Sequence, residues 1–336
     1  MIMSIKNRYE FLYFVECING NPNGDPDSGN FPRIDPQDMH GLISDVAVKR
    51  RIRNYIQISK GNVSPYGIVV QQSTNINKFI AQAHEQAKND SKAGTKDKVG
   101  AARRWLCENY YDVRTFGGVL STGANAGQVR GPIQLAFPRS IDPVVPMDIS
   151  ITRMAVAKNI KDVNTFEQYE KWESEQPEDE LRTMGRKQLI PYGLYEGRGF
   201  ISANLSEDTG FSEEDLILFW EAILNMYEHD HSASKGQMST LHPLIIFRHV
   251  GTDSDEEQRE RQAKLGCAPA HKLFELVKIR KKPEVSVARS YKDYVLKVSM
   301  SKAPKGVEIG FAIPAYNGVK IIWNNIPEEL DWVTAE

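Results

Sequence analysis

The sequence has little cysteine, no long apolar run and almost no net charge, and each shortage excludes a class of protein. Its three cysteines, Cys17, Cys107 and Cys267, are odd in number and far apart. That pattern excludes a disulfide framework and a paired-cysteine metal site. No window approaches the roughly 18 apolar residues of a membrane span, and the N-terminus lacks a signal-peptide pattern. We therefore expect a cytoplasmic protein with no membrane partner.

The charge balance argues against a generally basic nucleic-acid-binding domain. The 42 Lys and Arg residues nearly match the 44 Asp and Glu residues, which leaves a net charge of -2. A nucleic-acid-binding function must therefore depend on local charge. The charges gather in six segments, basic at 49–53, 103–104 and 278–282, and acidic at 161–181, 212–215 and 253–260. Such acidic segments can hide a basic surface in the sum over the chain.

Catalytic and metal-binding signatures are also missing. There is no Gly-x-Ser-x-Gly elbow, no Cys–His pair in a familiar context and no isolated carboxylate pair. His229 and His231 lack a second ligand pair at a known spacing. A calcium loop beginning at Asp25 would place Pro36 where a bidentate Glu is needed. We expect no metal, no cofactor and no catalytic residue.

The order of apolar segments predicts one α+β domain over residues 1–336. Residues 9–18 are apolar almost throughout and rich in aromatics, as in a buried central strand. Ser44 and Ser212 are placed to cap two helices, the second over 212–229. Further strand-like runs occur at 112–121, 130–137, 199–205, 244–250, 273–280 and 307–313. Because strands and helices mix without a regular βαβ repeat, α+β is the expected class.

A loop rich in Asn, Gly, Pro and Asp follows the first strand, over residues 19–38. Long irregular segments inside a compact domain are usually functional or mobile. Asn21, Asn23 and Arg33 are its candidate contacts to the backbone of a binding partner. An ordinary cluster of turns is the alternative.

The helix that begins at Ser44 carries the next candidates. Lys49, Arg50 and Arg53 fall on one face beside the apolar face formed by Val48 and Ile52. Three cations on one helix face, next to a loop of small residues, favour contact with phosphates. A solvated helix face is the alternative.

A glycine-rich segment over residues 116–132 permits close approach of a phosphate or a partner's backbone. Ser121, Thr122, Gln128 and Arg130 are its candidate contacts. Two strands joined by a flexible turn would explain the composition equally well. The segment matches neither a P-loop nor a dinucleotide fingerprint.

Two further stretches have the composition of the arms of a β-hairpin, over residues 149–157 and 184–192. Arg153 with Met154 on one arm, and Arg186 with Lys187 on the other, would hold phosphates and press an apolar side chain between nucleotides. The acidic insertion 159–182 would lie at the tip.

Several blocks resemble the Csd-type backbone subunit of the type I-C CRISPR Cascade complex, from the Cas-seven branch of the RAMP superfamily. The blocks span residues 14 to 275 in the family's order, whereas 59–98, 159–182 and the C-terminal tail depart from it. They are FVECINGNPNGDPDSGNFPR, DVAVKRRIRNY, DVRTFGGVLSTGANAGQVRGPIQL, SIDPVVPMDISITR, MGRK, PYGLYEGRGFI, TGFSEEDL and APAHKLFE.

The resemblance implies an RRM-like (ferredoxin-like) palm, a helical finger insertion over about 59–104 and a β-hairpin thumb over about 149–192. It implies a non-catalytic subunit whose copies line up along a CRISPR RNA and display its bases to a target DNA strand. The other expected partners are the processing endoribonuclease-type, large and small Cascade subunits. The alternative is a RAMP endoribonuclease acting on precursor or target RNA, with Asp25 or Asp27 as the candidate catalytic residue.

Overall fold

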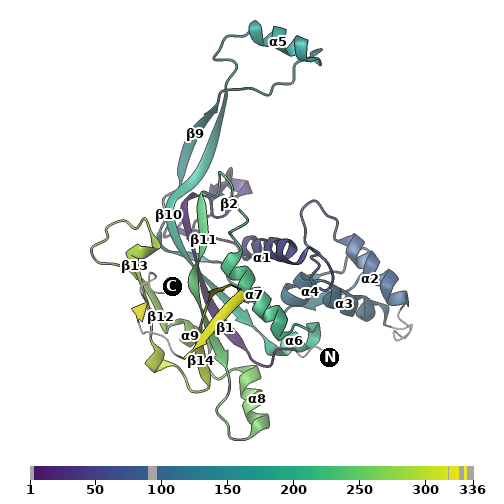
Figure 1. Ribbon diagram of the computed structural model, residues 1–336, viewed down its shortest axis with the longest axis vertical. Helices are drawn as coiled ribbons and strands as arrows, with labels where there is room; N and C mark the ends of the chain where they lie inside the picture. The colour runs from purple at the N-terminus through teal and green to yellow at the C-terminus, as the bar shows by residue number, and fades with distance from the viewer. Residues whose placement is uncertain (1–3, 90–96, 317, 325–328, 331–336) are drawn as a thin grey trace.

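The computed structural model describes residues 4–89, 97–316, 318–324 and 329–330. A nine-stranded antiparallel sheet forms the body of the fold (Figure 1). Its strands are β1 (Tyr9–Gly20), β4 (His40–Leu42), β7 (Ile133–Leu135), β8 (Arg139–Pro143), β9 (Met147–Arg153), β10 (Thr183–Ile201), β11 (Gln237–His249), β14 (Val307–Ala315) and β15 (Gly318–Trp323). They follow the order β15-β14-β11-β1-β10-β8-β4, and β7 and β9 also pair with β10.

β1 is the central strand, as its mostly apolar sequence predicts. It pairs with β10 on one side and with β11 on the other. Phe11 and Tyr13 belong to the core on one face of the sheet, and Leu12 and Phe14 to the core on the other face. A strand buried on both faces does not show alternating polarity, and this explains why its sequence is apolar at most positions, with Glu10 and Glu16 as the exceptions among residues 9–18.

Each face of the sheet has its own cover (Figure 1). Helices α1 (Asp45–Lys60) and α7 (Glu213–Asn225) cover the first face with side chains such as Ile52 and Trp220. The second face is covered by α9 (Ala270–Phe274) and a small sheet of β12 (Val277–Lys281), β13 (Tyr294–Val298) and β16 (Glu329–Leu330). The molecule is therefore a mixed helix and sheet fold, as expected for the α+β class.

The two predicted helix starts are confirmed. Ser44 Oγ accepts a hydrogen bond from Ala47 N at 3.3 Å, and Ser212 Oγ accepts one from Asp215 N at 3.2 Å. The Asp215 carboxylate accepts from Ser212 N at 3.1 Å, which completes a capping box. Both cap residues can therefore be predicted from the local sequence.

Residues between α1 and the glycine-rich segment form a helical unit with its own small core. It contains α2 (Asn77–Asn89), α3 (Lys98–Asn109) and α4 (Tyr111–Phe116). The prediction of a strand over 112–121 is wrong, because α4 continues to Phe116 and only then does β5 (Gly117–Val119) begin. All six residues of α4 are buried, so tertiary packing overrides the strand propensity of the segment.

Short elements complete the chain. They are β2 (Gly24–Asp25), β3 (Phe31–Pro32), β6 (Gln128–Arg130), α5 (Phe166–Ser174), α6 (Ala203–Thr209) and α8 (Glu256–Leu265). The predicted runs 199–205 and 273–280 are strand only in part, since the first enters α6 and the second begins in α9. No helix in the described ranges combines the length and the apolar character needed to cross a bilayer.

Candidate nucleic-acid interface

The loop after β1 is fastened to the start of α1. Asn23 Oδ1 accepts a hydrogen bond from Ser44 N at 2.8 Å, and Arg33 Nη1 donates to Asp25 Oδ2 at 3.2 Å. Asn21 is buried, and its Nδ2 donates to the carbonyl oxygen of Asn30 at 2.7 Å. These side chains are therefore engaged within the protein, where they hold the loop in shape.

The three cations of α1 have different environments. Arg50 is exposed, and its Nη2 donates to Gln72 Oε1 at 3.4 Å. Lys49 is half-buried and pairs with Asp45 at 3.0 Å. Arg53 is buried, and its Nε donates at 2.9 Å to Asp112, a carboxylate on α4 that is itself buried. The prediction that Arg53 shares an outward face with Lys49 and Arg50 and contacts phosphates is therefore wrong, because Asp112 of α4 pairs with the buried Arg53 on that side of α1.

The glycine-rich segment forms a small hairpin next to α1. β5 and β6 pair, with Gly117 opposite Arg130. The ring of Phe116, which precedes β5, lies 5.7 Å from Lys49 Nζ. Ser121, Thr122, Gln128 and Arg130 are all exposed. Thr122 Oγ1 donates to Asn77 Oδ1 at 2.7 Å, whereas Arg130 forms no ion pair within the described part of the chain.

The two predicted hairpin arms pair with each other and leave the body of the molecule (Figure 1). Thr183 lies opposite Arg153, and Leu189 lies opposite Met147. Residues 190–192 do not continue this pairing, since β10 there pairs with β1. β3 packs against β10, so the base of the hairpin lies beside the loop of Asn23 and Arg33.

The faces of this hairpin differ in character. Arg153 and Lys187 share one face with Ile149 and Ile151, because residues opposite each other and two apart point the same way. Arg186 lies on the other face and pairs with Asp148 at 3.0 Å. Met154, just beyond β9, is 66% exposed. Met184 lies opposite Thr152 on the Arg186 face and is 77% exposed, so the hairpin offers cations and exposed apolar side chains on both faces.

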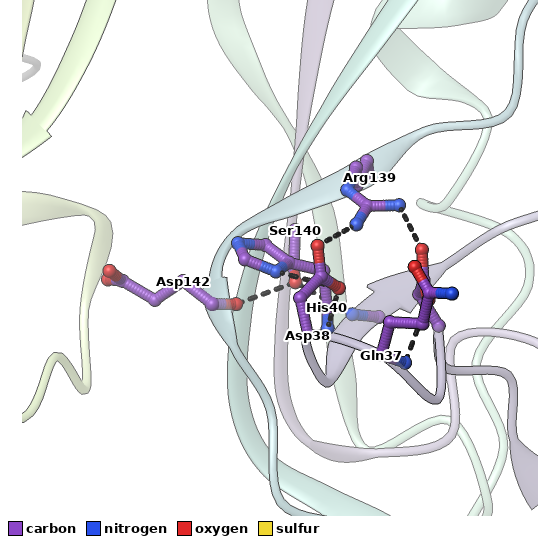
Figure 2. Close-up of polar contacts among 8 residues, drawn as sticks. Gln37, Asp38, His40, Arg139, Ser140 and Asp142 are labelled. Carbon is purple, nitrogen blue, oxygen red and sulfur yellow. Dashed lines mark hydrogen bonds and ion pairs between the residues drawn. The ribbon is translucent and has the colours of Figure 1, made fainter.

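Sequence reasoning missed a polar cluster where β4 meets β8 (Figure 2). Arg139 donates to Asp35 Oδ2 at 3.0 Å and pairs with Asp38, whose Oδ1 lies 3.1 Å from His40 Nδ1. Hydrogen bonds from His40 N and Arg139 lower the pKa of Asp38, and Asp35 raises the pKa of Arg139. Arg139 is about 100 positions away from the other members in the sequence, so no sequence spacing predicts the cluster.

Of the two aspartates considered for catalysis, Asp25 has a carboxylate engaged in structural contacts, whereas Asp27 is exposed and contributes its backbone N to them. Asp25 Oδ1 accepts from Asp27 N at 3.2 Å and caps a single turn, while Asp25 Oδ2 is occupied by Arg33. Among the described residues, no group of three or more His, Cys, Asp or Glu side chains is arranged to hold a metal ion.

Comparison with known proteins places the chain in a family. The family model for CRISPR-associated protein Cas7 matches residues 7–299. A CRISPR-associated protein Cas7 from Haloferax volcanii is 26% identical over 270 residues, or 74% of each protein. A chain of a CRISPR RNA-guided surveillance complex in a pre-nicking state aligns with a TM-score of 0.45 and 12% identity, over 78% of this chain and 84% of that one. A second surveillance-complex chain gives 0.37 and 12%, over 79% and 80%. The match to the family model covers most of the sequence, and the chain therefore belongs to the Cas7 family of CRISPR-associated proteins.

Proposed function

We propose that this protein is a non-catalytic backbone subunit that binds CRISPR RNA in a Cascade surveillance complex of type I-C. Family membership supports the general role, and the Csd-type blocks described above support the subtype. The proposal includes display of the RNA bases to a target DNA strand, with the processing, large and small subunits as the other protein partners.

One observation carries the proposal: segments far apart in the sequence gather around the start of α1. The Asn23 side chain ties the first loop to Ser44 at the cap of α1. Lys49, one turn later, reaches the Phe116 ring where the β5–β6 hairpin begins. The β9–β10 hairpin leaves the sheet beside the same loop. Exposed cations, small residues and glycines therefore surround one stretch of surface.

Such a surface suits recognition of a backbone. Arg50, Arg130, Arg153 and Arg186 are exposed and come from three different segments. Phosphate contacts fix the position of a strand without reading its sequence, and base pairing then supplies the specificity. The β9–β10 hairpin would act as a thumb that separates nucleotides, and the helical unit of α2 and α3 would act as the fingers beside an RRM-like palm.

The test combines sequencing of the co-purifying RNA with binding to RNAs of unrelated sequence over a range of salt. We expect repeat-derived RNA in the preparation, affinities within a few-fold of each other, and a steep salt slope. A strong preference for one sequence would contradict backbone recognition. Metal-dependent cleavage of labelled repeat RNA that disappears in Asp25→Ala or Asp27→Ala would favour the endoribonuclease instead.

A further inference from the structure

Arg51 is the remaining cation of the basic segment 49–53, and its place in the fold differs from that of its neighbours. Its exposed fraction is 7%, so it is buried, whereas Arg50 is exposed. Residues two positions apart on a helix point about 200° apart, so Arg51 and Arg53 leave α1 on nearly opposite sides. Arg53 meets α4, and Arg51 meets segments that surround the proposed RNA surface.

The Arg51 guanidinium joins three segments of the chain. Its Nη1 donates at 2.9 Å to the carbonyl oxygen of Ala47, one turn earlier in α1. Its Nη2 donates at 3.5 Å to the carbonyl oxygen of Pro22, in the loop that follows β1. Its Nε lies 3.1 Å from Asp230 Oδ2, in the α7–β11 loop formed by residues 226–236. Several donors in one rigid plane allow a single side chain to hold these acceptors together.

The α7–β11 loop is held near both of its ends. Tyr227, close to its start, has its ring centre 5.0 Å from the Arg51 guanidinium carbon. Lys235, close to its end, pairs with the same Asp230 carboxylate that Arg51 contacts. Removal of Arg51 would therefore release the loop from α1 without leaving the carboxylate unpaired.

The same loop lies directly against the first loop, which follows β1. Asn21 N donates at 2.7 Å to the carbonyl oxygen of Ser234. A Cβ atom at Gly20 would collide with a carbonyl oxygen of the α7–β11 loop, so the two main chains approach as closely as glycine allows. Two residues after Asn21, the Asn23 side chain accepts a hydrogen bond from Ser44 N at the cap of α1. The start of the first loop is therefore placed by the α7–β11 loop on one side and by α1 on the other.

These contacts lie at the end of the sheet where the β9–β10 hairpin leaves the body. Gln237, the first residue of β11, lies opposite Ile18 of β1, and Gly20 lies opposite Ile190 of β10. Figure 1 shows β2, which belongs to the first loop, at this same end of the molecule. Arg51 is nearly covered there, so it acts on the surface through the segments that it holds.

We propose that Arg51 is a positioning residue of the RNA surface. Through Pro22 and Asp230 it holds the first loop and the α7–β11 loop in the arrangement that receives the RNA backbone. It contacts no phosphate itself, because its three nitrogens all have partners within the protein. A surface arranged before binding loses less conformational freedom when the RNA binds, and this raises affinity. The inference rests on the proposed function, since it takes the first loop as part of the RNA surface.

The test compares two variants of this contact with a matched control in the full chain. Arg51→Met removes the guanidinium, and Asp230→Asn removes the charge of its carboxylate partner. The control is Arg53→Met, because Arg53 is 8% exposed, lies on the same helix and pairs with an aspartate of α4. Binding to an RNA too short for two copies is measured over a range of salt, well below the Tm of every variant. Hydrogen–deuterium exchange of a peptide that contains Asn21 is followed by mass spectrometry without RNA.

We expect Arg51→Met and Asp230→Asn to weaken RNA binding about tenfold. The slope of log K against log salt should stay the same, because the exposed arginines that would contact phosphates remain in place. The Asn21 amide should exchange faster in both variants, since the carbonyl oxygen of Ser234 is no longer held against it. Arg53→Met should match the wild type in affinity and in exchange, although its Tm falls.

Four results contradict the positioning role. Wild-type affinity in Arg51→Met would leave Arg51 a purely structural role, and an equal loss of affinity in Arg53→Met would attribute the effect to general destabilisation. A salt slope reduced by about 0.7 in Arg51→Met would make Arg51 a direct phosphate contact. Unchanged exchange at Asn21 would show that Arg51 does not hold the two loops. Failure of the wild type to bind RNA would contradict the proposed function instead, and the exchange measurement would still test the contact because it uses no RNA.

Discussion

Replacement of Arg53 by methionine should destabilise the protein without changing its contacts to RNA. Arg53 and Asp112 form a buried ion pair, and removal of one partner from such a pair costs about 3–5 kcal/mol. Asp112 keeps hydrogen bonds from Val69 N at 2.9 Å and Val70 N at 3.1 Å, which favours the lower end of that range. The unfolding entropy of a chain this long is about 0.7 kcal/mol per kelvin, so we expect Tm to fall by about 4 °C.

The assay pairs thermal unfolding with RNA binding as a function of salt. Arg50→Gln is the matched variant, because Arg50 lies on the same helix but is exposed. It should leave Tm nearly unchanged and reduce the slope of log K against log salt by about 0.7, the contribution of one phosphate on a single strand. An unchanged Tm in Arg53→Met, together with a reduced slope, would refute the structural role of Arg53.

Two further predictions concern the core. Burial raises the pKa of the Cys17 thiol to about 12 and that of Cys107 to about 11, so at pH 8 only the half-buried Cys267 should be alkylated in the native protein, as checked by mass spectrometry. Gly197→Ala should lower the free energy of unfolding by about 1–3 kcal/mol in a denaturant titration, because a Cβ there would collide with the Tyr13 ring. Full alkylation of Cys17 in the native protein would contradict the first prediction. An unchanged unfolding midpoint in Gly197→Ala would contradict the second.

Features that depend on neighbouring residues could be predicted from the sequence. The aromatic run of β1 indicates a strand buried on both faces, and Ser44 and Ser212 are caps because their hydroxyls reach the first turn of the following helix. The alternation along β14, with Val307, Ile309 and Phe311 inward, is equally local.

Features that depend on tertiary contacts could not be predicted from the sequence. The six residues of α4 read as a strand because Val113 and Thr115 favour one, and only their burial from every side selects a helix. Helical spacing places Arg53 beside Lys49 and Arg50, but the carboxylate that neutralises it comes from 59 residues away. The Arg139 cluster likewise spans about 100 positions. Charge on a helix face therefore marks candidates for phosphate contact without showing which of them remain free.

The β9–β10 hairpin allows a deletion that separates RNA contact from overall folding. β10 continues past the hairpin into the central sheet, where Ile190 lies opposite Gly20 of β1. A short Gly-Ser turn in place of residues 154–182 would remove the acidic tip and keep all seven strand pairs. A turn in place of 150–186 would also remove Arg153 and Arg186. Both variants should unfold near the wild-type temperature, because the hairpin contributes little buried apolar surface.

Binding to short RNA should distinguish the two deletions. We expect the 154–182 variant to bind with nearly the wild-type slope, because Arg153 and Arg186 remain on their paired strands. The 150–186 variant should lose about 1.4 from the slope, which is the contribution of two phosphates on a single strand. If the longer deletion binds short RNA as the wild type does, the two arginines do not contact phosphates. The hairpin would then act only through its tip, and the RNA surface would be confined to α1 and the glycine-rich hairpin.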